Sequence, residues 1–169
     1  MSTLVVDASA ALTLIVGEPA SRDVREHLHT VTVAAGRILV PPLFWLEVIN
    51  VLATRYRYDP AIIVESVYEL EQVGLVTAEV GRPGVLAVID ATARWGLTAY
   101  DAAYLVLAES AGASLLTADA RLAAAAGGRA ILVGTEGGVA DPPAGYATEP
   151  SWAAWKGSAA YLAELRSSL

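Results

Sequence analysis

The sequence predicts an α/β fold: one compact domain with a central, mainly parallel sheet of about five strands and helices on both faces. Short runs rich in Val, Ile and Leu alternate with longer stretches rich in Ala and Leu, the order expected when helices cover both faces of such a sheet. The chain has 169 residues, 55% of them hydrophobic, which is enough for one proper core but not for two.

Five apolar runs are the predicted strands. Proline stops the second of them, because it has no amide hydrogen to donate to a sheet, and glycine or small polar residues bound the others. The predicted strands are Thr3–Val6, Arg37–Val40, Leu75–Ala78, Ser114–Thr117 and Ala130–Val133.

Seven helices are expected between and after these strands. Asp59 and Thr98 are placed as N-caps, Pro42 lies where a helix can begin without losing a hydrogen bond, and Gly96 closes a helix. The predicted helices are Ser9–Val16, Pro19–Thr30, Leu43–Arg55, Pro60–Gln72, a stretch from after Gly84 to Trp95, Ala99–Ala111, and an alanine-rich stretch that ends at Ala126.

The composition changes after residue 133, so we expect the compact domain to span residues 1–133. Residues 134–150 are rich in Gly, Pro and small polar residues, which is typical of a linker over the surface. Residues 151–169 form a predicted C-terminal helical tail, and such an apolar helix face needs something to pack on. Several of its apolar residues are spaced to share one helix face; the residues are Trp152, Trp155, Tyr161, Leu162 and Leu165.

Composition limits the chemistry of any site. Without cysteine, neither a disulfide nor a thiolate metal site is possible, so a bound metal would have oxygen or histidine ligands. His27 and His29 are two residues apart on a predicted helix, where they cannot face the same ion, and a solvated helix face explains them better. Asp7 interrupts the first apolar run, which also lacks a basic flank, so we expect no signal peptide, no membrane association and a cytoplasmic protein.

The net charge of −7 argues against non-specific binding to nucleic acid, which usually requires a basic patch. This objection weakens if several carboxylates are metal ligands, because bound divalent ions reverse the sign of the local field.

Two of the candidate site residues follow predicted strands. Asp7 comes directly after the first strand, and Asp119 comes soon after the fourth. Ligands of open α/β sheets bind in the crevice beyond the carboxyl ends of the strands. The alternative for each residue is an aspartate that caps the helix that follows, and from the residues alone the two explanations have equal weight.

Two further carboxylates lie in apolar helices. Asp101 is in the first turn of a helix that is apolar on nearly every side, where an unpaired charge is costly, although the helix dipole would favour it. Glu47 is flanked by apolar residues, and its alternative is an ordinary surface glutamate. Several hard oxygen ligands without His or Cys are what Mg²⁺ or Mn²⁺ requires, so the four together imply bound cations or at least one raised pKa.

Four segments carry a resemblance to a known family. They are VVDASA at residues 5–10, PLFWLEVINVL at 42–52, LTAYDAAY at 97–104 and LLTADARL at 115–122. In this order the chain resembles the PIN-domain family and, within it, the VapC-type toxin ribonucleases, over roughly residues 3–133.

The resemblance implies a metal-dependent endoribonuclease that hydrolyses RNA with one or two Mg²⁺ or Mn²⁺ ions. Asp7, Glu47, Asp101 and Asp119 match the acidic positions that bind metal and carry catalysis. Ser9, Thr98 and Thr117 would hold these carboxylates or a metal-bound water, although ordinary helix capping explains Thr98 equally well. Arg121 is a candidate phosphate contact, and its alternative is an exposed helix arginine. The implied partners are RNA, a second copy in a homodimer and a small VapB-type antitoxin.

Two other functions compete with this one. A PIN fold without catalysis, acting as a binding or RNA-processing scaffold, is disfavoured because all four acidic positions are filled. A Mg²⁺-dependent phosphatase of the haloacid-dehalogenase type is disfavoured because Ser9 stands where that class has a second aspartate, and because the single lysine is Lys156 in the tail. The fold alone does not distinguish these functions.

Overall fold

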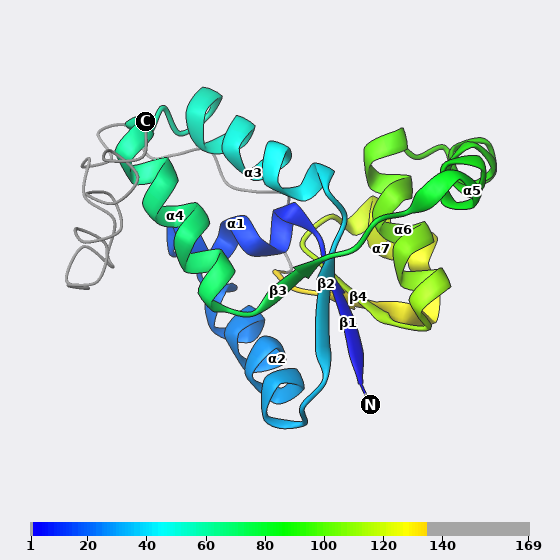
Figure 1. Ribbon diagram of the computed structural model, residues 1–169, viewed down its shortest axis with the longest axis horizontal. Coiled ribbons are helices and arrows are strands. Elements are labelled where there is room, and N and C mark those ends of the chain that lie inside the picture. The colour runs from blue at the N-terminus through cyan, green and yellow to red at the C-terminus, as the bar shows by residue number, and fades with distance from the viewer. Residues whose placement is uncertain (1, 135–169) are drawn as a thin grey trace.

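The protein is built around a five-stranded parallel sheet with helices on both sides (Figure 1). The computed structural model describes residues 2–134. The elements in chain order are β1 (Thr3–Val6), α1 (Ala8–Val16), α2 (Ser21–Val33), β2 (Arg37–Val40), α3 (Leu43–Thr54), α4 (Pro60–Gln72), β3 (Leu75–Thr77), α5 (Gly81–Trp95), α6 (Ala99–Ala111), β4 (Ser114–Thr117), α7 (Ala120–Ala126), a short 3₁₀ turn (Gly127–Arg129) and β5 (Ala130–Leu132).

The strand order is β3-β2-β1-β4-β5, and every neighbouring pair is parallel. β1 is therefore central, and the chain changes direction across the sheet between β1 and β4. Val6 pairs with Leu116 in the β1–β4 register, so these two strands end side by side. This is the switch point of an open α/β sheet, where ligands bind. The predicted class and its parallel sheet are confirmed.

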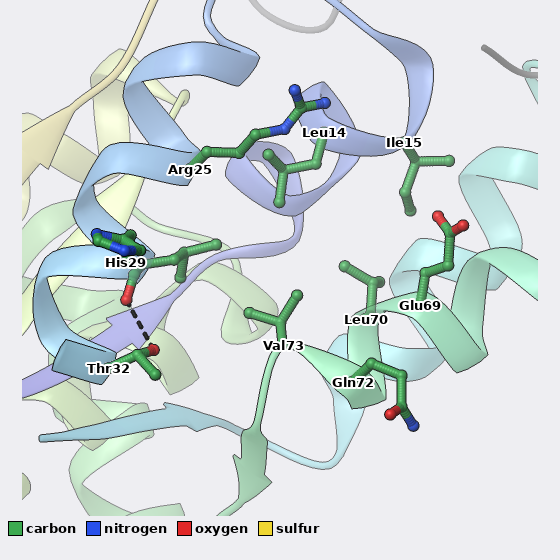
Figure 2. Close-up of a pocket in the computed structure, with 10 residues that line it drawn as sticks. Leu14, Ile15, Arg25, His29, Thr32, Glu69, Leu70, Gln72 and Val73 are labelled. Atoms are coloured by element: carbon green, nitrogen blue, oxygen red, sulfur yellow. Dashed lines mark hydrogen bonds between the residues drawn. The ribbon is translucent and has the colours of Figure 1, made fainter. Parts of the chain in front are cut away.

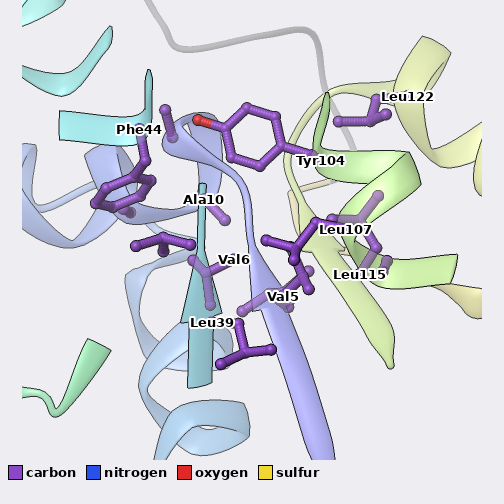
Figure 3. Close-up of a cluster of buried hydrophobic side chains, with 14 of the residues drawn as sticks. Val5, Val6, Ala10, Leu39, Phe44, Tyr104, Leu107, Leu115 and Leu122 are labelled. Carbon is purple, nitrogen blue, oxygen red and sulfur yellow. The ribbon is translucent and has the colours of Figure 1, made fainter. Parts of the chain in front are cut away.

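The core lies between the sheet and its two helical layers. Helices α1, α2 and α4 lie on one side of the sheet and α5 to α7 on the other (Figure 1). Val5 and Leu115 on the central strands are fully buried, as a parallel sheet covered on both faces requires. Phe44 of α3 and Tyr104 of α6, both 0% exposed, fill the space above the strand ends (Figure 3).

The start of α3 is anchored at two points. Phe44 is buried and packs edge-on against Trp45, with ring centroids 5.0 Å apart, and the indole N–H of Trp45 donates to Thr77 Oγ1 at 2.9 Å. The second contact ties α3 to the end of β3. These contacts fix the helix one turn before Glu47.

The start of α5 differs from the prediction. The helix begins at Gly81 and not after Gly84. Pro83 is tolerated because the first-turn amides of a helix have no intrahelical partner. Gly84 has another role: a Cβ placed there would lie 2.5 Å from Cγ1 of Val80, so the glycine makes room for that side chain.

Other differences are small. α2 continues to Val33, beyond the predicted end at Thr30, and the 3₁₀ turn before β5 was not predicted. The predicted linker and helical tail lie outside the described residues, apart from Gly134. No helix within residues 2–134 combines the length and apolarity needed to cross a bilayer.

Candidate functional site

Asp7 lies at the switch point and is 6% exposed. Its carboxylate accepts hydrogen bonds from Ser9 Oγ and, at 2.7 Å, from Thr117 Oγ1. Its backbone precedes α1, but its side chain makes no capping bond to that helix. The strand-end explanation therefore describes this carboxylate better than the capping explanation does.

Backbone amides hold Ser9 and Thr117 beside Asp7, and the two hydroxyl oxygens also lie 3.3 Å from each other. The Ala118 amide donates to Ser9 Oγ at 2.9 Å, and the Asp119 amide donates to Thr117 Oγ1 at 2.9 Å. Each hydroxyl oxygen is thus an acceptor for a backbone amide, which leaves its single proton for the carboxylate. The two hydroxyls orient Asp7 and favour its charged form.

Other influences oppose ionisation of Asp7. Burial raises the pKa of its carboxyl most, the hydrogen bonds from Ser9 and Thr117 lower it, and the charges of Asp101 and Asp119 raise it further. Asp7 is thus a buried acid with its ionised form oriented by hydroxyls and repelled by neighbouring carboxylates. A divalent cation would relieve that repulsion.

Glu47 is half-buried on α3 and accepts a hydrogen bond from the hydroxyl of Tyr104. Burial is again the largest cause that raises the pKa of Glu47; the Tyr104 hydrogen bond lowers it, and the charges of Asp7 and Asp101 raise it. No basic residue lies one helical turn from Glu47 in the sequence, and in the described residues its electrostatic neighbours are carboxylates.

Tyr104 is a site residue that the sequence analysis missed. It is fully buried, and its hydroxyl joins α6 to Glu47 on α3, 57 residues away. Burial, together with the nearby charges of Asp7 and Glu47, raises the pKa of Tyr104 and keeps the phenol a donor. One signal was present: Tyr104 is the single tyrosine in the buried part of α6, and a buried tyrosine hydroxyl needs a partner.

Asp101 and Thr98 form a reciprocal pair at the start of α6. The Asp101 amide donates to Thr98 Oγ1 at 3.1 Å, and Thr98 Oγ1 donates to the Asp101 carboxylate at 2.8 Å. Both explanations of Thr98 hold together, because it caps the helix and orients a carboxylate. Residues 102–108 are buried as predicted, while Asp101 itself is half-buried.

Asp119 caps α7, as its capping alternative predicted. One carboxylate oxygen accepts from the amides of Arg121 at 2.6 Å and Leu122 at 3.1 Å. The charge of Asp119 nevertheless reaches Asp7. Arg121 is exposed, and its guanidinium donates to the Gly96 carbonyl at 3.0 Å, so a local contact to the end of α5 already explains it.

The donor set suits a hard divalent cation in its chemistry, because it consists of carboxylate oxygens without nitrogen or sulfur. The arrangement is open: within residues 2–134, no three His, Asp or Glu side chains are grouped closely enough to form a metal-binding cluster. Asp7 is coupled to Asp101 and Asp119, and Glu47 to Asp7 and Asp101. His27 and His29 belong to α2 and are not among the groups that act on these carboxylates.

Fold and site define an α/β protein with electrostatically coupled carboxylates at the switch point of a parallel sheet. Comparison with known families adds the identity: the PIN domain family matches residues 4–128, and the chain belongs to that family. PIN domains are typically nucleases that use divalent metal ions, so membership points to the general class of nucleases and to RNA as a binding partner.

A solved structure supports this assignment. The crystal structure of PAE2754 from Pyrobaculum aerophilum is 27% identical in sequence, covers 77% of this chain and 88% of its own, and superimposes with a TM-score of 0.55. None of the curated proteins matches the chain.

Replacing Tyr104 with Phe should weaken both stability and the site. Glu47 would lose its donor, and because hydrogen bonds to charged groups contribute about 1.5–3 kcal/mol, we expect the free energy of unfolding in urea to fall by about that amount. The pKa of Glu47 should rise, because the interaction that lowers it is removed. Tyr100→Phe, an exposed change on the same helix, is the matched control. Equal stability of the two variants would contradict the role of Tyr104.

Proposed function

We propose that this PIN domain protein is a Mg²⁺- or Mn²⁺-dependent endoribonuclease toxin of the VapC type that acts in the cytoplasm. The observation that carries the proposal is the electrostatic coupling of Asp7, Glu47, Asp101 and Asp119 around the switch point. In the described residues, the only charges that act on Asp7 and Glu47 are those of other carboxylates. A divalent cation supplies the missing positive charge, and its remaining coordination positions can take a phosphodiester and a water.

Asp7, Glu47, Asp101 and Asp119 would hold one or two ions, which when bound supply a water of lowered pKa and offset charge on the leaving oxygen. The rest of the site holds the carboxylates in place. Each acid has its own support, from hydroxyls or from backbone amides: Ser9 and Thr117 orient Asp7, Tyr104 orients Glu47, Thr98 orients Asp101, and the first turn of α7 orients Asp119.

Such preorganisation suits metal binding, because supporting hydrogen bonds commonly change metal affinity or activity by about 10- to 100-fold. It also suits a reaction without a protein nucleophile. We therefore assign Ser9, Thr98, Thr117 and Tyr104 to positioning and the four acids to the metal and the substrate. Arg121 remains a candidate phosphate contact, which would require it to leave the Gly96 carbonyl.

The proposed partners are a second copy of the chain and a VapB-type antitoxin. Helix α5 supports a homodimer, because Val85, Leu86 and Ile89 are each more than half exposed at spacings that place them on one helix face. The net charge of −7 supports an antitoxin with a basic segment, by electrostatic complementarity. Such a segment would compete with metal for the carboxylates.

The test is cleavage of a mixed cellular RNA pool by the purified protein with Mg²⁺ or Mn²⁺. We expect discrete cuts that disappear with EDTA and in Asp101→Asn. The matched control is Asp90→Asn, an exposed aspartate on α5, which should cut like the wild type. Metal binding without any cutting would overturn the proposal and favour a PIN fold that binds RNA or a protein without catalysis.

A further inference from the structure

A hollow lies on the helical layer formed by α1, α2 and α4 (Figure 2). It has a volume of about 670 Å³, which is within the range of sites that bury a sizeable ligand or several side chains. Leu14, Leu70 and Val73 line it with apolar surface, and Arg25 and Glu69 lie on opposite helices at its edge. We call this hollow the α1/α2/α4 groove.

The groove is separate from the carboxylate site. None of the four acids lines it, and Leu14 lies about two helical turns beyond Asp7 along α1. Arg25 and Glu69 act on each other electrostatically, since the charge of Arg25 lowers the pKa of Glu69, which burial raises. The groove therefore offers an apolar floor with one charge of each sign at its edge, a surface that fits an amphipathic helix.

The described chain ends beside the connection between two of the groove's helices, α1 and α2. Gly134 follows β5 and lies against Ala20, because a Cβ added at Gly134 would be 3.5 Å from the Ala20 side chain. Ala20 joins α1 to α2, the helices that contribute Ile15 and Arg25 to the groove. Gly134, the last described residue, thus lies beside the connection between two helices that line the groove.

The segment beyond Gly134 has a sequence whose chemistry matches the groove. Residues 151–165 carry an apolar set at helical spacing, with Lys156 and Glu164 among them; the set is Trp152, Trp155, Tyr161, Leu162 and Leu165. The segment from 135 to 150 can span at most about 55 Å and, as a flexible linker, about 20–24 Å on average. For comparison, the groove-lining residue Ile15 is only five residues from Ala20 along the chain. A tether of this kind gives an effective concentration in the millimolar range.

We propose that the α1/α2/α4 groove is the docking site of this chain's own segment 151–165, with Trp152 and Trp155 against Leu14, Leu70 and Val73. The proposal does not depend on the nuclease function, because the groove contains none of the acids. It gives the apolar face of the tail a surface to cover. It also implies that a partner helix that binds the groove must displace the tail.

The absence of cysteine from the chain allows a direct test in the full-length protein. Gln72→Cys at the groove edge, exposed, is labelled with bimane, a fluorophore that tryptophan quenches on contact. We expect emission to be several-fold lower than in the same labelled protein that carries Trp152→Phe and Trp155→Phe, because phenylalanine keeps the apolar volume without quenching. Val73→Arg should restore emission by filling the groove with a charge.

The matched control is bimane at Asp90→Cys on α5, where the two Trp→Phe changes should leave emission unaltered. Docking within one chain predicts quenching that does not change on dilution or when excess unlabelled protein is added. If excess unlabelled protein relieved the quenching, the tail of a second copy would occupy the groove, and the proposal would be overturned. Equal emission with and without Trp152 and Trp155 would also overturn it and leave the groove open for another protein.

Discussion

Asp7→Asn should reduce metal-dependent RNA cleavage by at least about 100-fold, the upper end of what changes around a metal ligand commonly cost, and should stabilise the metal-free fold. The carboxyl of Asp7 is buried, and burial together with Asp101 and Asp119 raises its pKa. A group whose pKa is raised in the folded protein favours folding when it is neutral, so at pH 7 a permanently neutral amide is preferred. Ser9 and Thr117 can still hydrogen-bond the amide oxygen.

The measurement is thermal unfolding without divalent ions, beside cleavage with Mg²⁺. Opposite signs in stability and activity would identify Asp7 as an acid kept for function at a cost in stability. Asp23→Asn, an exposed aspartate on α2, should change neither quantity. A less stable Asp7→Asn protein would show that the carboxylate is structural, held by its two hydroxyls more strongly than its neighbours repel it.

The sequence predicts where individual strands end, but it does not predict which strands are neighbours in the sheet. The ends of β1 and β4 were predictable because proline, glycine and strand-forming runs act locally, and Asp7 followed from the first of these ends. The strand order β3-β2-β1-β4-β5 was not predictable, because the residues of one strand do not reveal which strand lies beside it. Only that order brings Thr117 to Asp7, 110 residues away.

The sequence named the four acids and, by resemblance, three of the side chains that hydrogen-bond them, but it missed Tyr104. Asp119 could be interpreted equally well as a cap or as a site residue, and its geometry makes it a cap whose charge also reaches Asp7. For Thr98 the sequence likewise left two equal explanations, a helix cap and a residue that orients a carboxylate. Tyr104 lacked any local signal for its partner, because Glu47 lies on a different helix. The predicted start of α5 was wrong because Gly84 was interpreted as part of a turn before the helix. Gly84 lies inside the helix, where it makes room for the side chain of Val80.

Divalent ions should reverse the pH dependence of stability above the ordinary carboxyl pKa of about 4. The pKa values of Asp7 and Glu47 are both raised in the folded protein. Without metal, the stability that their neutral forms contribute is fully present below the ordinary carboxyl pKa of about 4 and is lost as pH rises through the folded values. The metal-free melting temperature should therefore fall as pH rises from about 4 through the folded pKa values of the two carboxyls. Metal binds the ionised carboxylates, so stabilisation by Mg²⁺ should grow over the same interval.

At 100 times its dissociation constant, Mg²⁺ would add about 2.7 kcal/mol, which corresponds to roughly 5–10 °C in melting temperature for a chain of this size. Melting curves at a series of pH values, with MgCl₂ or with NaCl of equal ionic strength, separate binding from screening. Asp7→Asn should flatten the metal-free curve and remove most of the Mg²⁺ effect, because one change removes both a titrating group and a ligand. If Mg²⁺ stabilised Asp7→Asn as much as the wild type, the ion would bind elsewhere, and the coupled carboxylates would need another cation, such as a partner's basic side chain, to explain why four acids share one end of the sheet.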